Sequence, residues 1–138
     1  MKLHTLALCA IVLLAGCKST PPDTRSLESL SGAELYAQLC ASCHGVKARG
    51  DGPVAPLINI AVPDLTRIAA RRGGEFPTED VRRSIDGRWQ RPAHGPRDMP
   101  VWGWVFYDET ARQGAWDPAR VDAMLNRLVD YLRSIQVQ

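Results

Sequence analysis

Two cysteines and a histidine stand together in the first third of the chain and restrict what it can fold into. The residues run Cys40-Ala41-Ser42-Cys43-His44 in a chain of 138 residues. On a helix, positions three and four residues apart share one face, because the helical repeat is about 3.6 residues. Both thiols and the imidazole can therefore meet the edge of one flat ligand.

The order Cys-x-x-Cys-His matches the covalent attachment site of a c-type haem. Each thiol can form a thioether with one haem vinyl group, while the imidazole of His44 ligates the iron. Two other interpretations are a thioredoxin-like redox pair and half of a zinc site. No second cysteine pair completes a zinc site, and no strand-helix-strand pattern surrounds the motif. The sequence predicts one covalent haem c, held by Cys40, Cys43 and His44.

The chain begins with the features of an export signal. Lys2 precedes an apolar stretch from Leu6 to Leu14, which is shorter than the roughly 20 apolar residues that a spanning helix needs. The next residues, Leu14-Ala15-Gly16-Cys17, resemble the lipobox of bacterial lipoproteins. That resemblance implies a signal peptide over residues 1–16 and a lipid anchor on Cys17, on the periplasmic side of the inner or the outer membrane. The alternative is an ordinary secretory signal, which leaves Cys17 as a free thiol in an oxidising compartment.

The count of cysteines agrees with lipidation. Of the four, Cys9 leaves with the signal peptide, Cys17 takes the lipid, and the two in the motif take haem. Residues 17–30 are polar, include Pro21-Pro22 and show no apolar period, so we expect a flexible tether. Residues 31–138 suit one domain. The whole chain has a formal net charge of +2, which gives no indication of nucleic-acid binding.

Helix patterns cover both ends of the domain. Ser31 and Glu34 form a capping box that opens a helix, and the Cys-x-x-Cys-His motif closes it. Asp117 and Pro118 are a good N-cap and first residue for the last helix. Its apolar stripe consists of Val121, Leu125, Leu128, Leu132 and Ile135.

Between these ends, Gly- and Pro-rich loops over 45–63 and 88–103 flank two shorter helices. We expect Asp64 to cap a helix over residues 65–72 that Gly73-Gly74 stops. We expect Thr78 to cap another that ends near Asp86-Gly87. No strand pattern competes, so the fold class is all-α, with long loops around a cofactor.

Residues 32–135 resemble the class I c-type cytochromes. Gly32 with Tyr36, and Leu128 with Tyr131-Leu132, match the two terminal helices that cross closely in that family, where Gly32 permits the close approach. Met99-Pro100 stands where the family places its distal ligand. The resemblance implies a monohaem cytochrome c fold. Further segments resemble a bacterial subgroup, namely Gly45, Gly50-Asp51-Gly52-Pro53 and Pro63-Asp64-Leu65-Thr66.

Met99 is the predicted sixth ligand of the iron. Of the three methionines, Met1 is lost with the signal and Met124 lies in the last helix, whereas Met99 lies in a Pro- and Gly-rich loop. Its rival is His94 in the same loop. The choice affects the reduction potential, because a thioether favours ferrous iron more than a second imidazole does.

Other residues are candidates for contacts around the haem. The resemblance implies that a proline carbonyl accepts a hydrogen bond from the other ring nitrogen of His44, and we expect Pro53, then Pro56, in this role. The remaining candidates flank Met99 and either pack on the haem edge or pair with propionates, or else belong to the core and surface: Trp89, Arg91, Arg97, Trp102 and Trp104.

These observations predict a carrier of one electron, with redox proteins as partners, no small-molecule substrate and no catalysis. Two alternatives stay open: a fixed haem subunit of a membrane oxidase or dehydrogenase, and a haem enzyme or gas sensor whose distal ligand is absent or displaceable. Residues 67–97 hold eight Arg against four acidic residues. This excess either steers an acidic partner or forms the solvated face of two helices.

Overall fold

The computed structural model describes residues 26–88, 99–112, 114 and 117–137. The predicted signal peptide, Cys17 and most of the predicted tether lie outside these ranges. The described residues contain no strand, so the prediction of an all-α fold is confirmed. The helices are α1 (Gly32–Leu39), α2 (Ala41–His44), α3 (Thr78–Asp86), α4 (Trp102–Arg112) and α5 (Pro118–Ser134), and the 3₁₀ turns are η1 (Leu27–Ser29), η2 (Ala55–Leu57), η3 (Leu65–Arg67) and η4 (Ala70–Arg72).

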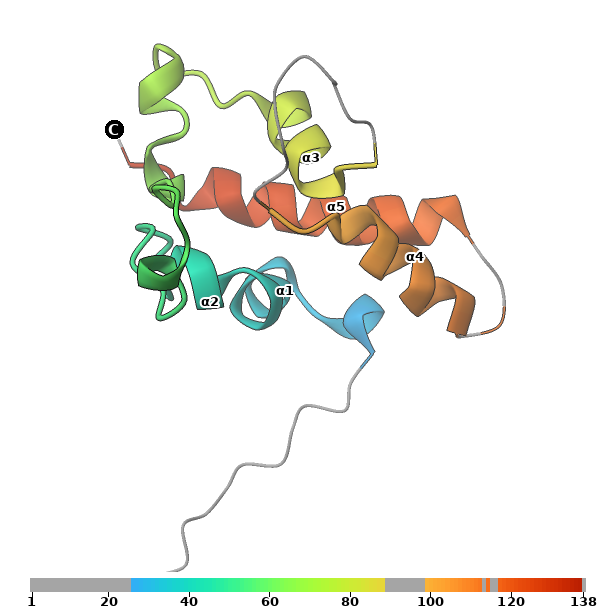
Figure 1. Ribbon diagram of the computed structural model, residues 1–138. Helices are drawn as coiled ribbons and strands as arrows, with labels where there is room; N and C mark the ends of the chain where they lie inside the picture. Colours follow the sequence, from blue (N-terminus) through green and yellow to red (C-terminus); the bar gives the residue numbers. More distant parts are fainter. Residues whose placement is uncertain (1–25, 89–98, 113, 115–116, 138) are drawn as a thin grey trace, which may run out of the picture.

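Helix α5 is the long element against which α1, α3 and α4 pack (Figure 1). It begins as predicted, because the Asp117 carboxylate accepts a hydrogen bond from the Ala119 N–H at 2.9 Å and Pro118 is the first helical residue. Its predicted stripe is confirmed as the core face, with Val121, Leu125, Leu128 and Leu132 buried and Ile135 half-buried at the C-cap. No helix in the described ranges is both long and apolar enough to cross a membrane.

The crossing of α1 and α5 depends on Gly32. A Cβ built on Gly32 would overlap the carbonyl oxygen of Arg127 and would lie 3.0 Å from the Cβ of Tyr131. One turn further along α1, the rings of Tyr36 and Tyr131 pack with their centroids 5.2 Å apart. The close crossing of the terminal helices is therefore present, and only glycine fits at its nearest point.

The capping box that opens α1 is also present. The Ser31 hydroxyl accepts a hydrogen bond from the Glu34 N–H, and the Glu34 carboxylate accepts one from the Ser31 N–H at 2.8 Å. The helix does not continue unbroken through the motif, because the backbone bends at Cys40, where φ is −116°. The short α2 then carries the rest of the motif.

The middle of the chain differs from the sequence prediction in two places. Asp64 caps its segment through Thr66 and Gly73 is left-handed, but residues 65–72 form the two separate turns η3 and η4 rather than one helix. Thr78 is the first residue of α3, and the N-cap position is occupied by Pro77. The Thr78 hydroxyl donates to the Phe76 carbonyl instead of capping the helix. The end of α3 at Gly87, with φ of 65°, is as predicted.

Helix α4 was not anticipated. Its buried positions are Gly103, Phe106 and Thr110. These lie at helical spacing, but only one of them is strongly apolar, so the hydrophobic period that reveals a helix is hidden.

Replacing Gly32 by Ala is expected to lower the free energy of unfolding by about 1–3 kcal/mol, because the added methyl forces α1 away from α5. Urea denaturation of the haem-loaded protein, followed by far-UV circular dichroism, measures this change. The control is Ala37→Ser on the exposed side of α1, for which a loss of about 0.5 kcal/mol is expected from helix propensity. Equal losses in the two variants would contradict the assignment of the close contact.

Candidate functional site

The Cys-x-x-Cys-His motif is helical apart from the bend at Cys40. The His44 N–H donates to the Cys40 carbonyl and the Gly45 N–H to the Ala41 carbonyl, both at 2.9 Å, which is the helical pattern. Cys40, Cys43 and His44 all line one cavity. Helical spacing therefore brings the three side chains together, as the sequence predicts.

Both cysteines are free thiols. Burial raises the pKa of the Cys40 thiol to about 12, and the neighbouring Cys43 raises it further in the same direction. Cys40 is thus an uncharged thiol at neutral pH. In the described part of the chain, no group of three or more His, Cys, Asp and Glu side chains is arranged to hold a metal ion.

Tyr36 connects the helix crossing to the motif. Its hydroxyl donates a hydrogen bond of 2.6 Å to the Gly45 carbonyl, directly after His44. The burial of this hydroxyl raises the pKa of Tyr36, with smaller contributions from Cys40, Tyr131 and Asp51. The phenol therefore stays protonated and keeps its role as a donor.

The loop after the motif folds back onto α2. The Gly50 N–H donates to the His44 carbonyl at 2.9 Å, and the Gly52 and Val54 N–H groups donate to the Cys43 and Ser42 carbonyls at 3.1 and 3.0 Å. These bonds satisfy the carbonyl groups that the end of a helix leaves without partners. A Cβ on Gly52 would overlap two of these carbonyls, so the close return requires glycine.

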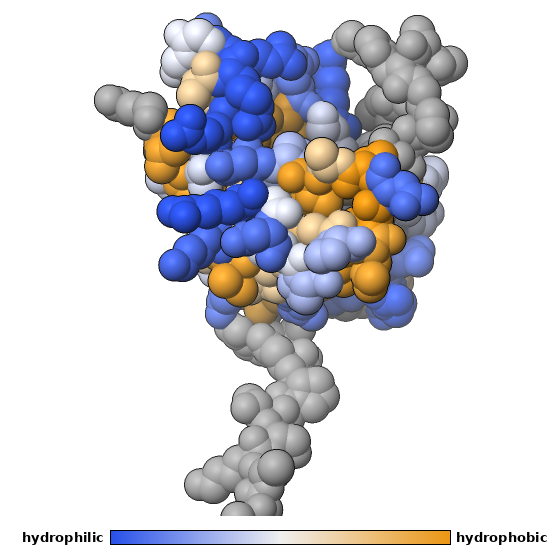
Figure 2. Space-filling view, turned by 60° about the vertical axis from the view of Figure 1, so that its left-hand side comes forward, coloured by the Kyte–Doolittle hydropathy of each residue, from blue (hydrophilic) through white to orange (hydrophobic). Residues whose placement is uncertain are grey.

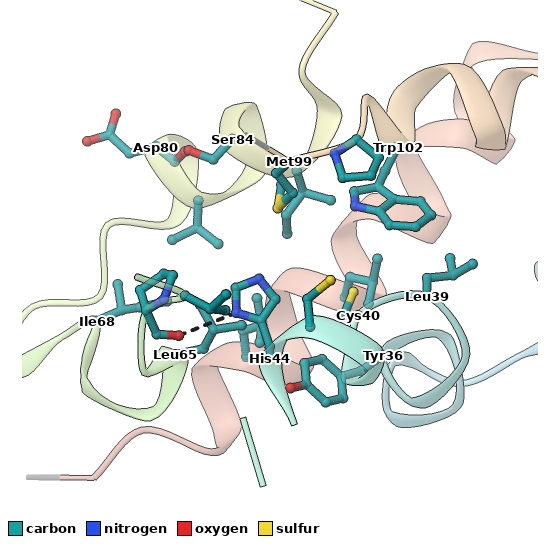
Figure 3. A pocket seen from close by; sticks show the side chains of 18 of the residues that line it. Tyr36, Leu39, Cys40, His44, Leu65, Ile68, Asp80, Ser84, Met99 and Trp102 are labelled. Atoms are coloured by element: carbon teal, nitrogen blue, oxygen red, sulfur yellow. Dashed lines mark hydrogen bonds between the residues drawn. The ribbon is translucent and has the colours of Figure 1, made fainter. Parts of the chain in front are cut away.

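The imidazole of His44 is oriented by the carbonyl of Pro63. Its Nδ1 lies 3.3 Å from the Pro63 oxygen (Figure 3), so Nδ1 carries the proton and donates. Burial lowers the pKa of His44, and the hydrogen bond to Pro63 opposes part of this effect. The ring is therefore neutral at neutral pH, with the lone pair of Nε2 available to a metal.

The prediction that Pro53 or Pro56 accepts this hydrogen bond is wrong. The backbone on either side of Pro53 is bonded to the end of α2, and Pro53 itself is exposed. Pro56 lies in η2 and is also exposed. Gly50 lets residues 62–63 approach the motif, because a Cβ at this position would overlap the Val62 carbonyl. This close approach brings the Pro63 carbonyl to His44.

Met99 lies on the opposite side of the same cavity. Figure 3 shows its sulfur facing the space above His44 and Cys40, between α3 and Trp102. Trp102, one of the candidates beside Met99, lines the cavity, whereas Trp104 points outward, is 56% exposed and packs against Tyr107. The rival ligand His94, and the candidates Trp89, Arg91 and Arg97, lie outside the described residues.

The cavity has a volume of about 560 Å³. This lies within the range of roughly 300–1,000 Å³ that is typical of ligand and cofactor sites. Helices α3 and α5, the end of α1 and the loop that follows the motif supply a mostly apolar wall: Leu39, Ile58, Ile60, Val62, Leu65, Ile68, Val81, Ile85, Leu128 and Leu132. An apolar slot with two thiols, a neutral imidazole and a thioether suits a haem.

Some residues that line the cavity were not singled out from the sequence. Ile58, Ile60 and Val62 alternate in the sequence, and this period of two was the pattern that could have identified them. Arg71 and Arg72 of η4 also line the cavity, and both are exposed. No sequence pattern distinguishes Arg71 and Arg72 from the other arginines nearby.

Gln136, after the end of α5, holds the segment that contains η3. Its side-chain carbonyl accepts from the Ala69 N–H at 2.9 Å, and its NH₂ group donates to the carbonyls of Leu65 and Leu132 at 2.8 and 2.6 Å. The Val137 N–H adds a bond of 2.9 Å to the Thr66 carbonyl. Gln136 and Val137, the C-terminal tail, therefore hold in place the part of the cavity wall that follows Pro63 in the sequence.

Four of the eight arginines in residues 67–97 form ion pairs within the described residues. Arg82 pairs with Asp122 at 2.5 Å, Arg83 with Glu79 at 2.9 Å, and Arg72 with Asp80 at 3.8 Å. Arg88 pairs with the buried Asp86. Among these pairs, only Arg82–Asp122 uses an acidic residue from outside residues 67–97, so the basic excess of this segment largely remains.

The fold and the cavity are those of a haem protein in which one helical turn carries the covalent attachment motif. Residues 29–136 match the family model described as Cytochrome c, so the chain belongs to the cytochrome c family. Members of this family bind covalently attached haem c and carry electrons. No curated protein and no solved structure matches the chain significantly.

Replacing Tyr36 by Phe is expected to lower the free energy of unfolding by about 1–2 kcal/mol, because the buried Gly45 carbonyl loses its donor. The measurement is urea denaturation of the haem-loaded protein. Tyr131→Phe is the matched control, since it removes a hydroxyl from the other ring of this packed pair and should change stability by less than about 0.5 kcal/mol. A loss in Tyr131→Phe as large as that in Tyr36→Phe would refute the role of the hydrogen bond.

Proposed function

We propose that this chain is a membrane-tethered monohaem cytochrome c that passes single electrons between periplasmic or membrane redox proteins. The observation that carries the proposal is the cavity in which Met99 faces the side that holds Cys40, Cys43 and His44. A bound haem c supplies an iron that alternates between the ferric and ferrous states. The chain supplies attachment, ligation, burial and an edge open to partners.

Cys40 and Cys43 would attach the haem, and His44 and Met99 would ligate its iron. Support for His44 comes from its hydrogen bond to Pro63, which leaves the second ring nitrogen directed to the cavity as a lone-pair donor. Support for Met99 comes from its place on the opposite wall. A histidine with a methionine favours the ferrous state and so raises the reduction potential.

Electron exchange needs a path from the buried group to the surface, and the cavity has one. Ile60, which lines it, is 40% exposed, and Val54 and Leu57 on the neighbouring loop are 37% and 82% exposed. Figure 2 shows apolar side chains at the surface among charged ones on this side of the molecule. An apolar rim of this kind allows a redox partner to approach the edge of the bound group without desolvating many charges.

The tether is supported by the sequence of the N-terminus. The lipobox-like Leu14-Ala15-Gly16-Cys17 and the polar, proline-containing stretch after it suit a diacylated Cys17 joined to the domain by a flexible linker. Two acyl chains anchor a protein stably, where one binds reversibly. A carrier held at the membrane meets membrane redox enzymes repeatedly.

Replacing Met99 by Ala tests the ligand assignment. We expect the near-infrared charge-transfer band between methionine sulfur and ferric iron to disappear, the reduction potential to fall, and carbon monoxide to bind the ferrous protein. Met124→Leu is the control, because Met124 is buried in the core face of α5 and a swap of similar volume should leave the band unchanged. A band that survives Met99→Ala would overturn the assignment, and strong carbon monoxide binding by the unaltered protein would favour an enzyme or gas sensor.

Metabolic labelling with palmitate tests the lipid anchor. We expect the unaltered protein to take up label, Cys17→Ser to take up none, and Cys9→Ser to label normally, because Cys9 leaves with the signal peptide. An unlabelled parent protein would show that the signal is an ordinary secretory one, and label that persists in Cys17→Ser would show that Cys17 is not the lipidated residue.

A further inference from the structure

The distal side of the cavity is built from two elements that meet at one point. Helix α3 contributes Val81, Ser84 and Ile85, and the residues that lead into α4 contribute Met99 and Trp102. These two elements are joined by a long connection, so the position of Met99 depends on how the start of α4 is held against α3.

A buried ion pair lies where the two elements meet. The Arg88 guanidinium donates from Nε to Oδ1 of Asp86 at 2.5 Å and from a terminal nitrogen to Oδ2 at 3.0 Å. The Asp86 side chain is 2% exposed and that of Arg88 is 23% exposed. Two parallel hydrogen bonds fix the direction of the guanidinium as well as its distance.

The first turn of α4 rests directly on this pair. A Cβ on Gly103 would overlap Oδ1 of Asp86 and would lie 2.7 Å from both the Arg88 Nε and the Asp86 carbonyl oxygen. Gly103 is buried, and its lack of a side chain lets the backbone of α4 reach the end of α3. Since Gly103 follows Met99 closely and Pro100 restricts the backbone between them, this contact restrains the location of Met99.

Stability alone does not account for a pair of this kind. The cost of removing two charges from water roughly cancels their attraction, so replacing a buried ion pair by uncharged residues is often neutral for stability. What such a pair does supply is geometry, because its hydrogen bonds are satisfied in one arrangement only.

We propose that Asp86 and Arg88 are positioning residues that hold the start of α4 against the end of α3 and so keep Met99 on the iron. This inference rests on the proposed function, in which Met99 is the axial ligand. Neither residue of the pair is among those that line the cavity, and the pair acts through the backbone around Gly103.

The test compares two signals from the haem-loaded protein during urea titration: the near-infrared methionine band and far-UV circular dichroism. In the parent protein both are expected to change together. In Arg88→Met the band is expected to weaken at least about twofold without urea and to vanish at lower urea than the helices, because the ligated arrangement becomes a smaller part of the population. The reduction potential should fall with it. Arg88→Lys, which keeps the charge without the paired hydrogen bonds, should be intermediate.

Arg83→Met is the matched control. Arg83 also belongs to α3 and pairs with Glu79, but both side chains are more than half exposed, so its band and midpoint should equal those of the parent. If Arg88→Met does not fold, the double variant Asp86→Asn/Arg88→Met removes both charges without adding volume. We expect it to unfold at nearly the parental urea midpoint and to show the same weakening of the methionine band.

Three results would overturn the inference. The first is a methionine band in Arg88→Met that stays at parental strength. The second is an equal shift of the band and the circular dichroism along the urea axis, as a purely structural defect would give, and the third is complete restoration of the band in the double variant. A parent protein without the band would instead refute Met99 as ligand, and the positioning role with it. The parental spectrum therefore separates failure of the proposed function from failure of this inference.

Discussion

The close crossing of α1 and α5 supports the rest of the structure. Gly32 brings the two backbones into contact, and the Tyr36 and Tyr131 rings fill the crossing one turn away. The Tyr36 hydroxyl donates a hydrogen bond to the Gly45 carbonyl and so fixes the end of the motif relative to this crossing. Because Cys40, Cys43 and His44 lie between these two points, a shift of one helix against the other would move all three together. The accuracy of the site is therefore set by a contact outside it.

Backbone hydrogen bonds, rather than regular helices, shape the part of the cavity wall that contains Pro63, the partner of His44. Residues 45–72 contain only short turns, and several of their backbone groups bond to α2, to neighbouring turns and to the Gln136 tail. Buried loops are costly when such groups lack partners. Gly50 and Gly52 allow the closest approaches that this irregular backbone makes.

Much of this arrangement was predictable from local patterns. The motif, the capping box and the stripe of α5 each depend on residues near one another in sequence, and the structure bears out the helices expected from them. Pro63 was missed because the partner of His44 is chosen by how the loop folds back, which no short-range pattern encodes. Helix α4 was missed because Gly103 and Thr110 occupy core positions that a hydrophobic period expects to be apolar. The ligand roles of Cys40, Cys43, His44 and Met99 remain predictions.

The two sides of the cavity differ in how much chain must be ordered to make them. Cys40, Cys43 and His44 lie within one turn, so bringing them together costs little loop-closure entropy. Met99 joins them only after the long chain between has found its place, and contacts of that kind form late in folding. We infer that in this cytochrome the thiol-bearing side is assembled first and the methionine side last. In the folded protein, opening fluctuations would follow the reverse order, with Met99 the first contact to be lost.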